Sequence, residues 1–338
     1  QECIPWRKLW EVLNWAVDHD LNTIQRLNQR LARGDWANIV RESDEAYAND
    51  VAAAAEQIVA RRGEIRIAIV AGPSSSGKTT TTTKLSLLLR ERGLHLVPLT
   101  VDNYFFDLEL HPKDEHGDYD YETPQALDLD LINEHLIALI SGEQVWVPFY
   151  DFKTGRQQRN HTPMQIAKDE IILIDSLHGL YAPMTSAVPA EAKFKLYIEP
   201  LLQMKDDRGE YVRWTDLRLM RRMERDATHR AYDPQRTLEH WHYVRSSELR
   251  NIVPYINTAD VIVNSALPYE LPVMKRRLQE SFARWAVQYD HDPLREDAAD
   301  RAKRVYSLLS QVSDGGPEEV IPGDSLLREF IGGSVYQV

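Results

Sequence analysis

The segment that most constrains this chain is GPSSSGKT at residues 72–79, which fits the pattern G-x-x-x-x-G-K-[ST] without a mismatch. In this pattern the glycines let backbone N–H groups turn inward around phosphate groups. The lysine, here Lys78, supplies positive charge to the outer phosphates, and the hydroxyl of Thr79 is placed to bind a magnesium ion. The segment therefore predicts a phosphate-binding loop.

The flanking residues support this interpretation. Residues 65–71 (IRIAIVA) are short, β-branched and almost wholly apolar, as expected of a strand buried on both faces, and residues 78–92 have helical periodicity. A helix that begins near Lys78 adds the positive end of its dipole to the loop. We therefore predict ATP and Mg²⁺ as cofactors, bound by Gly72, Ser74, Ser75, Ser76, Gly77, Lys78, Thr79 and Thr80.

Strand and helix signals alternate along the rest of the chain. Strands are expected at residues 95–101, 170–175, 194–198 and 261–263, and helices at 124–140, 216–228, 234–250 and onward to about 311. This alternation predicts an α/β fold, a doubly wound parallel sheet of the P-loop NTPase type. Residues 1–62 read as an added helical segment, so the expected domains are 1–62 and 63–338. The long acidic and aromatic connection at residues 102–123 is expected to be functional.

Composition excludes several classes of protein. The net charge of −12 argues against binding to nucleic acid or to an anionic membrane, and no apolar run approaches the ~18 residues that cross a bilayer. The single cysteine, Cys3, cannot form an internal disulfide, which favours a cytoplasmic location. Because the chain begins with Gln1, we expect a fragment of a longer protein. Whether it forms a homo-oligomer is left open.

Two aspartates are candidates for the chemistry beside the loop. Asp102 ends the strand expected at 95–101, at the edge where ligands bind in α/β sheets, and we predict that it is the general base for an acceptor hydroxyl. Asp175 closes the strand expected at 170–175 and is the predicted second magnesium ligand. A turn aspartate and a helix-capping aspartate are the respective alternatives.

An arginine-rich stretch predicts a lid at about residues 205–235. Six arginines lie between Arg213 and Arg230 against three acidic residues, although the whole chain is acidic. Arg218, Arg222 and Arg225 share one helix face, and planar guanidinium groups suit bidentate contacts to phosphate. The alternative is a solvated amphipathic helix.

A series of motifs resembles the uridine kinase and phosphoribulokinase family. In chain order these motifs are GPSSSGKTT, VDNYF, DYDYETPQALD, PFYDFKTGR, LIDSLHGL and DLRLMRRMERD. The segments NSALPYELPVMK and SLLREFIGGS are similar to a bacterial uridine kinase-like branch that carries TGS and threonyl-tRNA-synthetase-like domains upstream. The resemblance covers roughly residues 60 to 335.

The resemblance implies a role for several residues. Asp102 falls on the family's catalytic base, Glu122 on the acidic residue that holds ribose hydroxyls, and Tyr150 on the tyrosine that lies against the nucleobase. Asp175 stands where the family has a glutamate. The catalytic residues are then Asp102, Lys78 and Arg225. Arg222 and Arg230 are expected to bind the nucleotide. The residues expected to bind the acceptor are Asp102, Tyr104, Glu122, Tyr150 and Arg222.

Two departures concern the acceptor. Gly155 stands where animal-type uridine kinases place a histidine that reads the pyrimidine, and Tyr232 replaces a further arginine that contacts the nucleoside. The predicted function is an ATP-dependent kinase acting on a nucleoside such as uridine or cytidine. The alternatives are a kinase for another alcohol, such as a sugar, a polyol or a pentose phosphate, and a nucleotide-binding regulator without catalysis.

Overall fold

The fold is centred on a five-stranded parallel sheet. The computed structural model describes residues 3–113, 119–229 and 233–336. The strands are β1 (Ile67–Ala71), β2 (His95–Pro98), β5 (Glu170–Ser176), β6 (Lys193–Glu199) and β7 (Val261–Asn264), in the order β2-β5-β1-β6-β7. The central strand β1 pairs with β5 and β6, so that the loop after it opens in the middle of the carboxyl edge.

The alternation of side chains along β1 divides the interior into two cores. Ala68 and Val70 face one core, and Ile67, Ile69 and Ala71 face the other, because successive residues of a strand point to opposite faces. All five residues are buried, which explains the nearly continuous apolar sequence of this strand. The predicted α/β fold with a doubly wound parallel sheet is confirmed.

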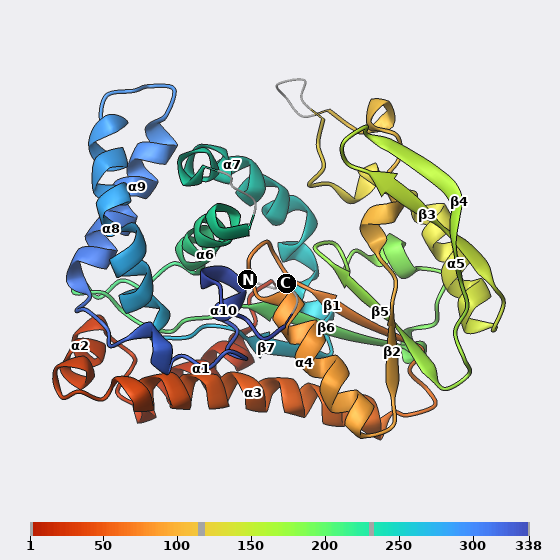
Figure 1. The fold of residues 1–338 in the computed structure, drawn as a ribbon, viewed down its shortest axis with the longest axis horizontal. Coiled ribbons are helices and arrows are strands. Elements are labelled where there is room, and N and C mark those ends of the chain that lie inside the picture. Colours follow the sequence, from red (N-terminus) through yellow and green to blue (C-terminus); the bar gives the residue numbers. More distant parts are fainter. Residues whose placement is uncertain (1–2, 114–118, 230–232, 337–338) are drawn as a thin grey trace.

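Helices cover both faces of the sheet (Figure 1). Their bounds are α1 (Trp6–Asp18), α2 (Ile24–Ala32), α3 (Trp36–Ala60), α4 (Lys78–Glu91), α5 (Leu129–Ile140), α6 (Trp214–His229), α7 (Pro234–Asn251), α8 (Glu270–Gln288), α9 (Glu296–Gln311) and α10 (Arg328–Ile331). The helix expected from residue 124 begins at Leu129, because the side chain of Asp128 accepts a hydrogen bond from the Leu131 N–H and caps the helix. Within the described residues, no helix is long and apolar enough to cross a membrane.

The three N-terminal helices pack on the same core as the helix that follows the phosphate-binding loop. α3 lies against α4 and β7, and the Tyr47 hydroxyl of α3 is 2.7 Å from the Thr81 hydroxyl of α4. The predicted helical character of the first 60 residues is therefore confirmed. The division into domains 1–62 and 63–338 stays a prediction.

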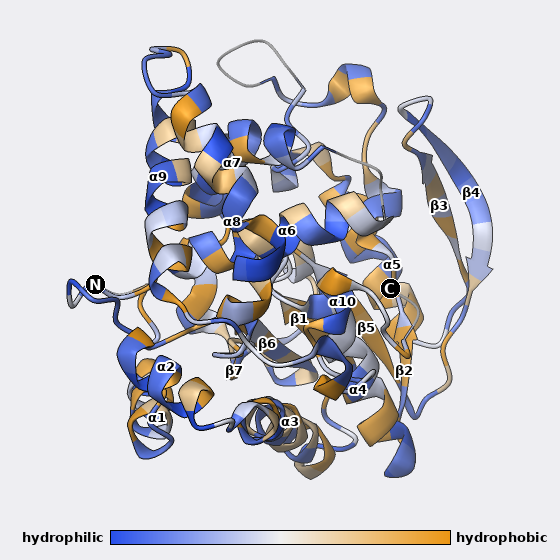
Figure 2. Cartoon of the chain, turned by 60° about the vertical axis from the view of Figure 1, so that its left-hand side comes forward, coloured by the Kyte–Doolittle hydropathy of each residue, from blue (hydrophilic) through white to orange (hydrophobic). Residues whose placement is uncertain are grey.

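An antiparallel hairpin, which the sequence analysis did not predict, stands beside the sheet. It consists of β3 (Val145–Asp151) and β4 (Arg156–Met164). Most of β4 is exposed and hydrophilic, as Figure 2 shows, so its sequence RQQRNHTPM lacks the apolar alternation by which strands are recognised. The hairpin matters here because it carries Tyr150 and Gly155.

Candidate active site

The loop between β1 and α4 has the conformation that the motif requires. A side chain at Gly72 would place a Cβ 2.3 Å from the carbonyl oxygen of Ile198, so only glycine fits between the loop and β6. Gly77 has a φ of 95° and directly precedes α4, a conformation that L-residues rarely adopt. The loop thus turns tightly between β1 and α4, and the N-terminal end of α4 points toward the inner side of the loop.

Lys78 is folded back over the loop. Its Nζ donates to the carbonyl oxygens of Gly72, at 2.9 Å, and Pro73, at 3.2 Å. Burial lowers the pKa of Lys78, whereas Asp175 and Glu329 oppose that shift. A lysine at this position of the loop supplies positive charge to bound phosphate groups.

The serine hydroxyls of the loop fit a phosphate-bearing ligand. The Oγ atoms of Ser75 and Ser76 are buried without a hydrogen-bond partner, whereas buried hydroxyls are normally paired. Ser74 is engaged with α6 instead: its carbonyl oxygen accepts from Arg218 at 3.2 Å, and its hydroxyl lies 3.3 Å from Arg222 Nη1. The loop therefore joins a phosphate cradle to the arginine-rich helix.

Thr79 and Asp175 are the residues that could hold magnesium. Thr79 is exposed at the start of α4, and Asp175 lies near the carboxyl end of β5, paired with Val70 of β1. Asp175 is accessible to solvent, yet burial by the surrounding protein raises its pKa to about 6. No group of three or more His, Cys, Asp or Glu side chains within the described residues could hold a metal. Threonine and one carboxylate suit magnesium bound together with substrate phosphates.

Asp102 lies near the loop lysine but not at the end of a strand. β2 ends at Pro98, and Asp102 belongs to a 3₁₀ turn, Val101–Tyr104, which corrects the predicted position. The strand is shorter than expected because the backbone at Leu99 donates a last bond to Leu173 and the chain then turns. Burial raises the pKa of Asp102, and the charge of Lys78 opposes this rise.

The carboxyl group of Glu122 lies within the electrostatic influence of Arg222. Burial raises the pKa of Glu122, with Arg222 the largest opposing influence and Lys78 a smaller one. The carbonyl oxygen of Glu122 accepts hydrogen bonds from Ser247 and Asn251 of α7, which fix this part of the long connection. Glu122 and Arg222, predicted separately from sequence, are therefore brought together.

The remaining predicted lid arginines differ in environment. Arg225 is partly buried and donates to the neighbouring Asp226 at 3.2 Å, and its charge contributes to lowering the pKa of Lys78. It therefore lies close to the phosphate side of the site. Arg230 and Tyr232 lie outside the described residues.

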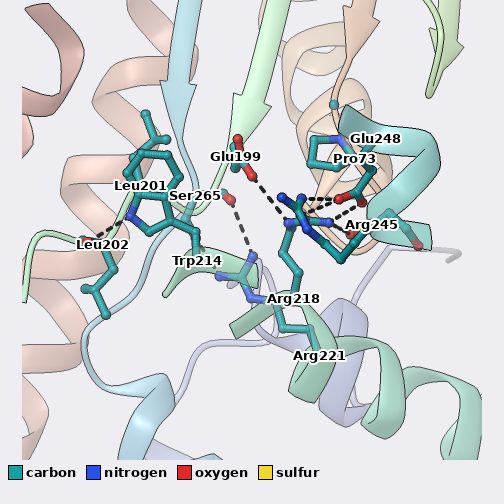
Figure 3. A network of polar contacts seen from close by, with 12 residues as sticks. Pro73, Glu199, Leu201, Leu202, Trp214, Arg218, Arg221, Arg245, Glu248 and Ser265 are labelled. Carbon is teal, nitrogen blue, oxygen red and sulfur yellow. Dashed lines mark hydrogen bonds and ion pairs between the residues drawn. The ribbon is translucent and has the colours of Figure 1, made fainter. Parts of the chain in front are cut away.

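Arg218 and Arg221 are core residues, which corrects the prediction for Arg218: it does not share the role expected of Arg222 and Arg225 toward phosphates. Both side chains are 0% exposed. Arg218 forms two hydrogen bonds to Glu248 of α7, at 2.5 and 2.8 Å, and an ion pair with Glu199 at 3.4 Å (Figure 3). Arg221 pairs with Glu270 and also donates to the carbonyl oxygen of Ser265. These pairs anchor α6 to the body of the protein.

Tyr150 belongs to an aromatic cluster on the acceptor side. Its ring lies 5.5 Å from Phe105, 4.9 Å from Phe152 and 6.2 Å from His111, and Tyr121 joins the same group. The backbone N–H of Tyr150 donates to the side chain of Asn103, the residue after Asp102. The cluster is thus tied to the turn that holds the predicted base.

Gly155 and Tyr104 have structural roles. Gly155 has a φ of 66° in the hairpin turn, and an added Cβ would meet Leu108 Cβ at 2.9 Å, so a histidine is strained there. Tyr104 is completely buried, and its hydroxyl is 2.8 Å from His135 Nδ1 of α5. This position does not support the predicted contact between Tyr104 and the acceptor.

Three carboxylates beside the loop were not recognised from sequence. Glu199 is the last residue of β6, Glu248 lies within α7, and Glu329 comes from α10 and accepts hydrogen bonds from Thr80. A carboxylate at the end of a parallel strand is a recognisable signal, which Glu199 satisfies. The positions of Glu248 and Glu329 beside the loop follow from tertiary contacts, which the sequence does not show.

A phosphate-binding loop at the centre of a parallel sheet, ringed by carboxylates and arginines, defines a P-loop phosphotransferase. The particular family follows from comparison with known proteins. The sequence profile of the Phosphoribulokinase / Uridine kinase family matches residues 67–270, more than half of the chain, and the protein belongs to this family. It is therefore a kinase, and the family implies ATP as phosphate donor.

Known proteins similar to this chain include curated uridine kinases and solved kinase structures. The uridine kinase of Halobacterium salinarum is 25% identical over 226 residues, 65% of this chain and 91% of the relative. The uridine kinase of Deinococcus deserti is 27% identical over 195 residues, 57% of this chain and 84% of the relative. Among solved structures, a possible uridine kinase from Bacillus stearothermophilus aligns with a TM-score of 0.40 at 16% identity, covering 64% of this chain and 98% of that one.

Proposed function

We propose that this kinase transfers the γ-phosphate of ATP to a hydroxyl group of a nucleoside of the uridine and cytidine type. The observation that carries the proposal is the position of Lys78, whose charge opposes the pKa rise of Asp102, Asp175 and Glu122. A single cation from the phosphate-binding loop thus lies near both acceptor-side carboxylates and near the proposed metal ligand. Such convergence is what in-line transfer between a phosphate and a hydroxyl requires.

The donor side would be held by the loop and the start of α4. The backbone of Gly72 and Gly77, the hydroxyls of Ser75 and Ser76 and the Lys78 cation fit a phosphate chain. We assign Thr79 and Asp175 to Mg²⁺. When bound, magnesium ATP supplies the phosphoryl group, and the metal offsets its negative charge.

The acceptor side would be organised by the two carboxylates. Asp102 accepts the proton from the attacking hydroxyl, a role favoured by its raised pKa, because a stronger base takes the proton more readily. Glu122 accepts hydrogen bonds from neighbouring hydroxyls of the acceptor, and Tyr150, which is only 2% exposed, supports this side from within the aromatic cluster. Arg222 links the two sides through Ser74 and Glu122.

A second acceptor class is favoured by one observation. Gly155, required by the hairpin turn, cannot provide the hydrogen bond to a pyrimidine that a histidine would provide. A site without that donor or acceptor discriminates poorly among bases. A sugar, a polyol or a pentose phosphate is therefore the second candidate, because the groups that bind hydroxyls are present.

The experiment is a measurement of kcat/KM for uridine, cytidine, a purine nucleoside and several polyols at fixed magnesium ATP. We expect phosphorylation of pyrimidine nucleosides, with uridine and cytidine differing by less than about tenfold, or ~1.4 kcal/mol of transition-state binding. A polyol preferred over both nucleosides would establish the second candidate. Binding of ATP without turnover on any hydroxyl compound would instead indicate the regulator.

Two further expectations stay predictions: a cytoplasmic location and the absence of nucleic-acid binding. Each concerns the protein beyond the site described above. Neither is needed for the phosphotransfer proposal.

A further inference from the structure

The C-terminal segment passes directly over the start of α4. Leu326 packs against Gly77, where an added Cβ would meet its Cδ1 at 2.5 Å, and Asp324 forms an ion pair with Lys84 at 3.0 Å. Figures 1 and 2 both place α10 beside the end of α4 that faces the phosphate-binding loop. The segment is thus close to the nucleotide site, although it lies more than 240 residues later in the sequence.

Glu329 of α10 is hydrogen-bonded to the first turn of α4. Its Oε2 accepts from the backbone N–H of Thr80 at 3.0 Å and from the Thr80 hydroxyl at 2.8 Å. Thr80 is 0% exposed and Glu329 is 4% exposed. The bonds are therefore shielded from water, and hydrogen bonds to an ionised carboxylate are among the stronger ones in proteins.

The donors that Glu329 occupies are of the kind that bind phosphate. The first N–H groups of a helix have no partner within the helix, and in P-loop proteins they point at the phosphates of the nucleotide. Thr80 is the third residue of α4 and directly follows Lys78 and Thr79. A carboxylate that accepts from both its N–H and its hydroxyl stands where a phosphate oxygen would stand.

We propose that Glu329 is an internal competitor of the phosphate donor, whose carboxylate must leave Thr80 before a donor phosphate can bind there. The inference rests on the proposed use of ATP and adds a residue that sets the affinity for it. Because Thr80 has no exposed surface, a phosphate cannot reach it while the carboxylate is in place. Two anions competing for the same two donors bind in a mutually exclusive way.

The surroundings of Glu329 indicate that only its side chain moves. Leu326, Leu327, Phe330 and Ile331 are buried in the core, and Arg328 donates to the carbonyl oxygens of Glu318 and Ile321. The backbone of α10 is therefore fixed. The charge of Glu329 also contributes to raising the pKa of Asp175 and opposes the lowering of the pKa of Lys78, which places the carboxylate close to the phosphate and metal residues.

The test compares three variants by isothermal titration calorimetry with magnesium ATP. Glu329→Gln removes the charge but keeps an oxygen that can accept from Thr80, so the fold should be retained. Glu329→Asp keeps the charge and withdraws it by one methylene group. Glu319→Gln is the matched control, because Glu319 is exposed on the same C-terminal segment. Thermal denaturation verifies that each variant is folded.

We expect Glu329→Gln to tighten ATP binding about tenfold or more and Glu329→Asp to tighten it by a smaller factor, with Glu319→Gln unchanged. An unchanged or weaker affinity in folded Glu329→Gln would overturn the proposal. Tighter binding in Glu329→Gln with parental affinity in Glu329→Asp would also overturn it. In that case the negative charge at residue 329 would set the affinity, and not the occupation of the Thr80 donors by its carboxylate. If neither the parent nor any variant bound ATP, the proposed function itself would be wrong, and the inference with it.

Discussion

Replacement of Arg218 by methionine tests whether α6 is anchored by buried ion pairs. Arg218 is 0% exposed, and it connects Glu248 of α7, Glu199 of β6 and the carbonyl oxygen of Ser74 in the phosphate-binding loop. Methionine fills a similar apolar volume but cannot donate a hydrogen bond. The substitution leaves two buried carboxylates facing a side chain without charge.

The structure indicates how large the effect should be. Removing one partner of a buried ion pair typically costs about 3–5 kcal/mol, because the remaining charge is left uncompensated. Here one feature reduces the cost, because Arg245 also contacts Glu248 and continues to compensate its charge. We therefore expect a loss near the lower end, about 3 kcal/mol of unfolding free energy.

The assay is urea denaturation followed by circular dichroism, with Arg213→Met as the control. Arg213 is exposed just before α6, so its replacement should change stability by less than about 0.5 kcal/mol. Equal stability of Arg218→Met and the parent would refute the argument. A loss of the same size in the exposed control would refute it as well, because the effect would not depend on burial.

Further predictions concern the chemistry. Lys78→Ala should remove most turnover while the protein stays folded, as measured by initial rates and circular dichroism; near-normal turnover would contradict the phosphotransfer assignment. Asp102→Asn should lower kcat about 10²-fold or more with little change in the Kd of ATP, and an equal loss of ATP binding would instead make Asp102 a metal ligand. Because the pKa of Asp175 is about 6 and its carboxylate binds magnesium only when ionised, the affinity for magnesium ATP should fall as the pH drops below 6 and level off above about pH 7. This pH dependence should be weaker in Asp175→Asn, although other titrating groups of the site remain. Arg225→Lys should turn over more slowly than the parent, because lysine lacks the planar pair of donors, and parental turnover would show that Arg225 does not serve the phosphates.

The sheet and most helices could be predicted because their sequences carry local signals. β1 is wholly apolar, β5 and β6 contain the shorter apolar runs 171–174 and 196–198, and α4 follows a motif with a fixed relation to the strand before it. β4 could not be predicted, since its exposed residues follow no alternation and its pairing with β3 is the only cause of its strand conformation. Local sequence signals do not predict a strand whose side chains are mostly exposed and whose conformation depends on pairing with a neighbouring strand.

The site was only partly predictable for a related reason. Spacing identified the arginines of α6 but could not distinguish Arg218, which pairs with Glu248 in the core, from Arg222, which contacts Ser74 of the phosphate-binding loop. The two lie one helical turn apart, and only the packing of α7 against α6 separates their roles. Likewise Glu329 accepts a hydrogen bond from Thr80, which is 249 residues away in the sequence, and a local sequence pattern cannot predict such a contact.

The two halves of the site differ in how they are built. The phosphate half rests on β1, α4 and α6, which are fixed by buried pairs such as Arg221 with Glu270 and by the contact between Leu326 and Gly77. The acceptor half is carried by a 3₁₀ turn, the long connection that contains Glu122, and a hairpin whose outer strand is exposed. Loops on a rigid scaffold tolerate change more readily than the scaffold itself. The reaction class therefore follows from the well-anchored half, whereas we expect the choice of acceptor to depend on side chains held by the variable half.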